Sequence, residues 1–470
     1  MKGWLKLLSI PAVLIGAGGL IYTLRPSSPQ VPLSHVRNVI LISIDTLRAD
    51  HLSSYGYPRP TTPKLDAFAQ RGALFEQVIS SSGWTVPAHM TMLTGVDPPI
   101  HGAQGYPKPR HATRNIPTLA EILRQRGFRT AAFTGGGYIA STFGFNRGFE
   151  KFTSKGRHFT DSIGLVRRWV RAPRDQPFFL FFHGFDVHRP YKPPPRYAKL
   201  FTDGYAGDFK AAALRADHPQ PSEEDLRFTI SQYDAEIRAV DDLLGDLLEE
   251  LDDMGLLDET LVVITSDHGD EFYEHGHVYH AHTLYEELLR VPLIVVGPGV
   301  VPAIHRRQVG LIDLTPTILG VLGLTEARKG MQGVDLTPVL TGQAEPPERL
   351  LFSFLRYSAV DWSVAAARAD EWKLIAWNLA GMRDFRMRKT SKEYLHKMRL
   401  DRREDFVELF DLRDDPGETR DVGADHPEAR DRLAAILKAR SEENADQSND
   451  TDMPVLREKD IEALKALGYL

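Results

Sequence analysis

Cysteine is absent from this 470-residue chain, which excludes a disulfide framework, a thiolate zinc site and a cysteine nucleophile. A basic surplus is also missing, because 57 lysines and arginines stand against 63 acidic residues and the formal net charge is −6. Proteins that bind nucleic acid usually need a basic face, so nucleic acid is not an expected partner. The sequence contains no internal repeat, and its 42% hydrophobic content is sufficient for a large globular core.

An apolar run from Leu7 to Leu24 follows two lysines at the N-terminus. A run of about 18 residues is near the lower limit for a helix that spans a bilayer. We therefore expect residues 4–24 to be an uncleaved membrane anchor, and a cleaved signal peptide is the alternative. Under either interpretation the positive residues stay inside, and the bulk of the chain is extracytoplasmic.

Strand and helix patterns alternate through the first two thirds of the chain. Helical patterns begin at Pro63 and Ile116, and a long apolar stripe follows the capping residue Ser222. This alternation predicts an α/β fold with a mostly parallel sheet covered on both faces. The continuous apolar runs that predict buried strands are Asn38–Ile44, Arg129–Phe133, Pro177–Phe182, Thr260–Thr265 and Pro292–Val296.

Beyond about Gly342 the strand-like runs become shorter and more alternating, and this change in pattern defines the expected domain boundaries. Residues 1–35 form the anchor and tether, and residues 36–342 form the catalytic domain. Residues 343–440 are expected to form an α+β subdomain with a small antiparallel sheet and one packing helix. Residues 441–470 are expected to be a polar tail that ends in a short amphipathic helix.

Acidic residues and histidines follow the predicted strands. Open parallel sheets bind ligands at the carboxyl ends of their strands, so these side chains are expected to converge on one rim. Carboxylates and imidazoles on one rim are suitable ligands for a divalent cation. The candidates are Asp45 after the first strand, His183, Asp186 and His188 after the third, and Asp267, His268, His275, His277, His280 and His282 after the fourth.

Thr85 precedes Pro87, a residue suited to the first turn of a helix. One interpretation makes Thr85 a helix cap whose hydroxyl only satisfies backbone donors. The other makes it a nucleophile, because free amides at a helix start attract an anionic ester. A threonine hydroxyl needs a base or a metal to lower its pKa, so the second interpretation depends on the predicted metal site.

Several motifs together resemble the sulfatases of the alkaline-phosphatase superfamily. The resemblance extends from Asn38 to about Arg440, with the motifs in the family's order. It implies an alkaline-phosphatase-like sandwich and hydrolysis of a sulfate or phosphate ester. The matching segments are Asn38–Tyr57, Thr61–Asp66, Thr85-x-Pro-Ala-His89 with Leu93-Thr-Gly95, Ser266-Asp-His-Gly269, Glu274-His-Gly276, Leu284–Glu287, Arg290–Leu293, Asp313–Thr317 and Leu409–Leu412 with Asp415–Glu418.

This resemblance assigns Asp45, Asp267 and His268 to one divalent metal ion, with Thr85 completing its coordination. The metal is Ca, Mg, Mn or Zn, because carboxylates suit the first two and an imidazole admits the others. His89 stands where the family has an arginine that steadies the nucleophile.

The resemblance also implies roles for histidines of the later loops. His188 would contact the substrate oxyanion or protonate the leaving group. His280 stands near the residue that binds the transferred group, and His282 is the alternative in register. His275 is interpreted as a structural partner within its own turn.

Three departures from the family pattern affect the expected chemistry. A threonine at position 85 cannot become formylglycine, so no formylglycine is expected. Thr46 follows Asp45 where sulfatases usually have a second acidic residue, and Phe133-Thr-Gly-Gly-Gly137 replaces the K-W-H-L-G element. These departures favour direct attack by a metal-activated hydroxyl, on phosphorus or in an unusual sulfatase.

Three rival functions remain open at this point. The first is a two-metal phosphodiesterase with a second site formed by Asp186, His188 and His280 or His282. The second is a transferase that moves a phospho-head-group, and the third is an inactive relative that only binds. The expected substrate is an anionic ester: a sulfated or phosphorylated glycan, lipid or small molecule.

Overall fold

The computed structural model describes residues 33–173, 175–214, 221–357, 363–378, 406–447 and 451–467. The predicted anchor at residues 4–24 lies outside these ranges. Within them, no helix is both long enough and apolar enough to cross a bilayer.

A nine-stranded sheet forms the centre of the fold, in the order β10-β2-β9-β6-β1-β5-β3-β4 with β11 paired to β2. Among these strands only β9 runs antiparallel to its neighbours, so the predicted mostly parallel sheet is confirmed. The strands are β1 (Asn38–Ile44), β2 (Ala73–Ile79), β3 (Arg129–Phe133), β4 (Lys151–Thr153), β5 (Phe178–Gly184), β6 (Thr260–Thr265), β9 (Arg290–Val296), β10 (Ala303–His305) and β11 (Val309–Gly310).

Strand β2 was not among the sequence predictions. Glu76 and Gln77 interrupt its apolar run, and the pairing with β9 shifts register between Phe75 and Val78. A bulge of this kind breaks the side-chain alternation on which the sequence prediction depends.

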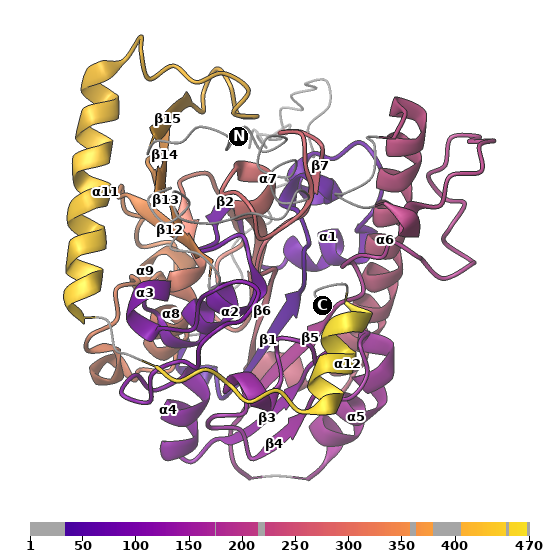
Figure 1. The fold of residues 1–470 in the computed structure, drawn as a ribbon. Helices are drawn as coiled ribbons and strands as arrows, with labels where there is room; N and C mark the ends of the chain where they lie inside the picture. The colour runs from indigo at the N-terminus through magenta and orange to yellow at the C-terminus, as the bar shows by residue number, and fades with distance from the viewer. Residues whose placement is uncertain are drawn as a thin grey trace, which may run out of the picture. The chain divides into compact units, whose positions relative to one another are not determined.

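The side chains of the central strands alternate between two cores, one on each face of the sheet. In β1, Val39 and Leu41 join one core, and Ile40 and Ile42 join the other. Figure 1 shows helices on both sides of these strands, as predicted. Helices α2 (Thr85–Thr94), α4 (Leu119–Gln125) and α8 (Leu314–Val321) cover the first face, and α1 (Pro63–Ala69), α5 (Phe159–Arg171) and α6 (Glu223–Asp253) cover the second.

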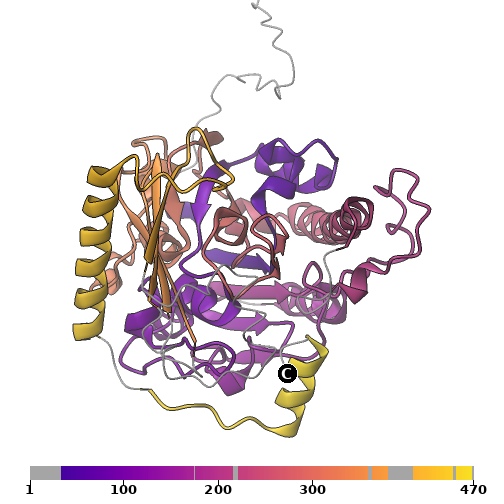
Figure 2. The same cartoon turned by 45° about the horizontal axis from the view of Figure 1, so that its top comes forward.

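An antiparallel sheet of four strands follows the nine-stranded sheet in the chain. One of its faces joins the core around α2, and the other packs against α11 (Pro427–Gln447), which runs along it in Figure 2. The helix extends past residue 440, as far as Gln447. Asn444, in this last part, is buried and donates to the carboxylate of Asp97 at 3.1 Å. The strands are β12 (Leu351–Arg356), β13 (Ser363–Arg368), β14 (Trp372–Asn378) and β15 (Phe406–Asp411).

Candidate active site

The carboxyl ends of β1 and β6 bring together a buried cluster of Asp45, Asp267 and His268. The two strands are neighbours in the sheet, so residues more than 220 positions apart meet at one edge. One potential ligand atom from each residue lies within 4.8 Å of the others. All three side chains are fully buried.

In each carboxylate of this cluster, one oxygen accepts a hydrogen bond and the other does not. Oδ2 of Asp45 lies 3.2 Å from Nε2 of His183, and Oδ1 of Asp267 accepts from the backbone N–H of Thr46 at 3.2 Å. The other two oxygens, Asp45 Oδ1 and Asp267 Oδ2, are buried and accept no hydrogen bond. Buried polar atoms are rarely left without a partner, so this pair of oxygens fits a cation. The donor set of two carboxylates and one imidazole suits a divalent metal.

The pKa values of the two carboxyl groups diverge because they share one buried space. Burial and the neighbouring Asp267 charge raise the pKa of Asp45 well above its ordinary value. Burial also acts to raise the pKa of Asp267, but His268 and His89 outweigh it and lower that pKa. Two acidic groups at this separation cannot both ionise easily without a compensating positive charge.

His183 fixes the orientation of Asp45, whereas the strand-end pattern predicted it only as one of several possible metal ligands. The backbone N–H of Gly135 donates to Nδ1 of His183 at 3.3 Å, so in the neutral ring Nε2 carries the proton and faces Asp45. Burial lowers the pKa of the His183 ring well below its ordinary value, which is consistent with the neutral form. An added Cβ at Gly135 would lie 2.5 Å from the Phe185 ring, so a side chain would prevent this approach.

Thr85 is the first residue of α2, and its hydroxyl points into the cluster. The cap of this helix is Trp84, which makes no side-chain capping bond, so Thr85 does not act as the cap. Thr85 Oγ1 lies 3.1 Å from Nε2 of His268. Nδ1 of His268 is 2.9 Å from the carbonyl of Gly269, which can only accept. The proton of the neutral ring is therefore on Nδ1, and Nε2 presents its lone pair to the side of Thr85.

His89 contacts the backbone of Thr85 and not its hydroxyl. Nδ1 of His89 donates to the carbonyl of Thr85 at 2.9 Å and lies 3.3 Å from Asp267 Oδ2. Nε2 of the ring is 2.9 Å from the hydroxyl of Ser43 in β1. His89 therefore joins the first turn of α2 to β1 and to Asp267, a positioning arrangement.

His188 and His280 stand beside the cluster, and each uses Nδ1 as a fixed donor. Nδ1 of His188 donates to the carbonyl of Arg189 at 2.7 Å, and Nδ1 of His280 lies 2.5 Å from Asp270. The His280 ring is 4.5 Å from that of His268 and 5.0 Å from that of His188. Burial lowers the pKa of both rings well below the ordinary value.

The turn residues around the cluster adopt backbone angles that side chains rarely take. Thr46 has φ 59°, and Tyr279 and Ala281, which flank His280, have φ 75° and 68°. A β-branched residue with positive φ is a true outlier, and such strain concentrates at functional sites. The Thr46 hydroxyl turns back to the carbonyl of Asp45 at 2.7 Å, so its side chain does not replace the second acidic residue of the family.

Asp186 and His282 do not join the cluster of Asp45, Asp267 and His268 in the described part of the chain. The Asp186 carboxylate accepts from the backbone N–H of Phe159 at 2.7 Å, at the start of α5. His282 lies 2.7 Å from Glu271.

A second acidic and histidine group is formed by Glu271, His275 and Glu287. Both ring nitrogens of His275 are engaged there, with Glu287 at 2.8 Å and the carbonyl of Glu418 at 3.1 Å. The ring stacks on Tyr285 with centroids 3.7 Å apart. These contacts give His275 a structural role, but its ring partners are Glu287 and the turn after β15 and do not belong to its own turn, where the partner was expected.

The C-terminal segment packs against the glycine loop Phe133–Gly137, which stands in the place of the K-W-H-L-G element. Leu467 directly follows α12 (Glu458–Ala466). Its side chain is so close to Gly137 that a Cβ added to this glycine would lie 2.3 Å from a Leu467 methyl carbon. Arg157 donates to the carbonyl of Ala466 at 3.0 Å and also contacts the carbonyl of Arg189. Figures 1 and 2 show α12 beside α5 and the parallel strands.

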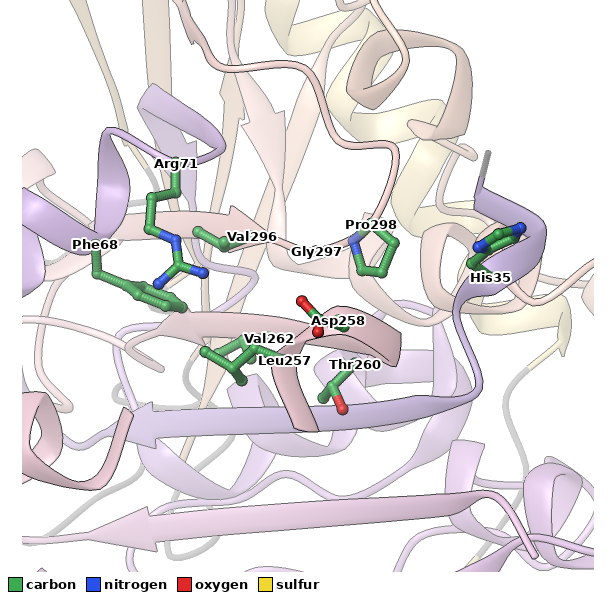
Figure 3. Close-up of a pocket in the computed structure, with 10 residues that line it drawn as sticks. All are labelled: His35, Phe68, Arg71, Leu257, Asp258, Thr260, Val262, Val296, Gly297 and Pro298. Atoms are coloured by element: carbon green, nitrogen blue, oxygen red, sulfur yellow. The ribbon is translucent and has the colours of Figure 1, made fainter. Parts of the chain in front are cut away.

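A cavity of about 380 Å³ lies at the opposite edge of the sheet (Figure 3). Its lining includes Thr260, the first residue of β6, and Val296, the last residue of the antiparallel β9. Asp267 and His268 follow the other end of β6. Arg71, on its wall, is already paired with Asp252 at 2.7 Å. This cavity is therefore separate from the candidate active site.

Comparison with known proteins identifies relatives of this chain. The sulfatase family model matches residues 37–324, more than half of the chain, and the model of the N-sulphoglucosamine sulphohydrolase C-terminal region matches residues 273–387. Choline-sulfatase of Rhizobium meliloti is 24% identical over 402 residues, which cover 72% of this chain and 78% of that protein.

Solved structures share the fold. One, a protein in complex with its substrate D-glucosamine-2-N,6-O-disulfate, has a TM-score of 0.70 at 19% identity and covers 89% of this chain and 99% of its own. Phosphonate monoester hydrolase of Agrobacterium radiobacter has a TM-score of 0.64 at 20% identity, with 87% and 96% covered.

Proposed function

The chain belongs to the sulfatase family of ester-hydrolysing enzymes, and from that premise we propose that it cleaves an anionic ester through a covalent intermediate on Thr85. One observation carries the proposal: Thr85 Oγ1 is 3.1 Å from His268 Nε2, beside two buried carboxylate oxygens that accept no hydrogen bond. Asp45, Asp267 and His268 would hold one divalent cation. When bound, the cation would lower the pKa of the Thr85 hydroxyl and stabilise negative charge on the ester.

The reaction then proceeds by in-line displacement. A bond forms between Thr85 Oγ and the sulfur or phosphorus atom, and the bond from that atom to the leaving oxygen breaks. The proton of the hydroxyl passes through water to the neutral His188 and from there to the leaving oxygen. Water releases the acid from Thr85, and the hydroxyl regains its proton. His280 is proposed to contact the transferred group, because its ring lies between those of His268 and His188.

We propose a sulfate monoester as the substrate class, with a phosphate or phosphonate ester as the second candidate. Choline-sulfatase and the protein solved with a disulfated glucosamine are named for sulfated compounds. The second candidate is favoured by Thr85 itself, since a threonine cannot provide the formylglycine of standard sulfatases. The proposed location is outside the cytoplasm, held by an anchor at residues 4–24.

An activity panel tests the proposal. Sulfate monoesters, phosphate monoesters and phosphodiesters are offered with and without a chelator, and the protein is quenched during turnover for mass analysis of the peptide that contains Thr85. We expect one ester class to be cleaved, only without chelator, and a sulfuryl or phosphoryl mass to appear on Thr85. Turnover without any modification of Thr85 would reject the covalent route.

A further inference from the structure

Four arginines line a cavity of about 320 Å³ between the catalytic domain and the antiparallel sheet: Arg290, Arg306, Arg307 and Arg368. The acidic residues in the lining are Glu286 and Asp370. The chain as a whole has a formal net charge of −6. The lining of this cavity, with four arginines and two acidic residues, is instead positively charged.

One of these arginines has a structural role. The Arg368 side chain is only 5% exposed, and its guanidinium contacts Glu286 at 3.0 Å and the amide oxygen of Gln308 at 2.7 Å. Lys373 also contacts Glu286, at 3.1 Å. The carboxylate of Glu286 is therefore shared by two cations, of which Lys373 also contacts the Glu418 carboxylate at 2.9 Å. Asp370 is the other acidic residue of the lining.

The other three arginines are weakly compensated. Arg290 donates to the backbone carbonyl of Glu76 at 3.1 Å, and Arg307 donates to that of Pro346 at 3.4 Å. Arg306 is 84% exposed and reaches the Glu76 carboxylate only at 3.8 Å. Neutral carbonyls and a long, exposed ion pair satisfy little of the binding capacity of three guanidinium groups.

The cavity lies at the same edge of the sheet as the candidate active site. Arg290 begins β9 and pairs with Ile79 at the end of β2, and Arg306 and Arg307 directly follow β10. The short helix α7 (Glu286–Leu289) joins the two places, since the backbone N–H of Gly269 donates to the carbonyl of Leu288 at 2.9 Å. In Figure 1, α7 and β2 are labelled next to each other.

We propose that this cavity is a second anion-binding site, separate from Thr85, that takes a sulfate or phosphate group. Guanidinium groups bind tetrahedral oxyanions through paired charge-assisted hydrogen bonds, and 320 Å³ is within the range of small-ligand sites. The group is either a free oxyanion or part of a substrate that carries several such groups. The assignment does not depend on the reaction proposed for Thr85.

The test is calorimetric titration of the whole, chelator-treated protein with two separate probes, inorganic sulfate and sucrose octasulfate. Chelation removes the cation-dependent site, so the binding that remains reports on the arginine cavity. We expect the double variant Arg306→Gln/Arg307→Gln to bind sucrose octasulfate at least about tenfold more weakly than the parent. Weaker binding of both probes supports a site that accepts free oxyanion, and weaker binding of sucrose octasulfate alone supports a site for a group on a larger molecule.

A charge-matched control separates a local site from general attraction. The control variant Arg124→Gln/Arg227→Gln removes one arginine from α4 and one from α6, whose side chains are 56% and 68% exposed. It should bind both probes like the parent. Equal loss in the two double variants, or no loss in either, would overturn the proposal. If the first double variant does not fold, Arg306→Gln alone is used, because this side chain is 84% exposed and its replacement should disturb the fold little. The single variant should weaken sucrose octasulfate binding severalfold.

Discussion

The hydroxyl oxygen of Thr85 lies 3.1 Å from Nε2 of His268, although 183 positions separate the two residues in the chain. The N-terminal turn of α2 and the carboxyl end of β6 meet at this contact. It places a potential nucleophile directly beside the proposed cation ligands, and the first three predictions depend on it.

Replacement of Thr85 tests the nucleophile. We expect Thr85→Ala to lower kcat/KM by at least about 10³-fold, because no other hydroxyl takes its place at the cluster, and Thr85→Ser to retain part of the activity. Thr94→Ala is the matched control: it removes another buried hydroxyl of α2, one that donates to the carbonyl of Met90 at 2.7 Å. Steady-state kinetics on the ester found in the panel give the measurement, and parental activity in Thr85→Ala would contradict the assignment.

Metal content separates one cation from two. We expect one divalent ion per chain, and we expect Asp267→Asn to weaken its binding by more than about 100-fold, because an amide removes the charge of a direct ligand. Asp186→Asn should leave the metal content unchanged, since that carboxylate accepts from the backbone of Phe159. Elemental analysis of the purified proteins measures the number of metal ions per chain. Two ions in the parent and one in Asp186→Asn would favour the two-metal alternative.

His89 should affect the rate more than substrate binding. The ring holds the carbonyl of Thr85 and contacts Asp267, so its loss would leave α2 in place but the nucleophile less well oriented. We expect His89→Gln to lower kcat by about 10- to 100-fold with a small change in KM. His101→Gln, a change at another buried histidine that contacts Thr91 at 3.1 Å, should lower kcat far less. A change confined to KM would argue against a positioning role.

His275 should make stability depend on pH. Burial acts to lower the pKa of this ring, but the hydrogen bond and charge of Glu287 outweigh it and raise the pKa from 6.5 to about 9. The folded state therefore binds the proton more tightly than the unfolded chain, so the stabilisation is complete below about pH 6.5 and is lost as the pH rises through 9.

Denaturant unfolding at pH 6 and pH 9.5 measures this effect. We expect the parent to lose on the order of 1–3 kcal/mol of the free energy of unfolding between these pH values, because the pKa of His275 is raised in the folded state. His275→Gln should be less stable at pH 6 and should lose less stability over the same interval. The same loss in both proteins would show that other groups control the pH dependence.

Local sequence patterns were sufficient for the parts of the fold with strong periodicity. Continuous apolar runs predicted β1, β3 and β6 with the observed bounds, and Asp45 was found because it follows such a run directly. The rule that ligands bind at the carboxyl ends of parallel strands also places Asp45 and Asp267 at one edge of the sheet.

The rest depends on contacts that a single sequence does not encode. The role of His183 arises from a backbone N–H of Gly135 on one side and from Asp45 on the other. Likewise, the choice between His280 and His282 depends on which ring the turn at Tyr279 and Ala281 directs toward His268, and positive φ values at two non-glycine residues are not visible in the sequence. The place of His183 near a strand end made it a candidate, but its contact with Asp45 could not be predicted from that position.

The central position of β1 in the sheet has a consequence for how the protein matures. Its two neighbours are β5 and β6, so Ser43 pairs with His183 on one side and with Thr265 on the other. Contacts this distant in sequence form late and slowly, and nascent β1 must remain unpaired until both partners have been synthesised. A truncated chain that stops before β6 would retain the hydroxyl of Thr85 but would lack Asp267 and His268, two of the three proposed cation ligands, so we expect it to be inactive.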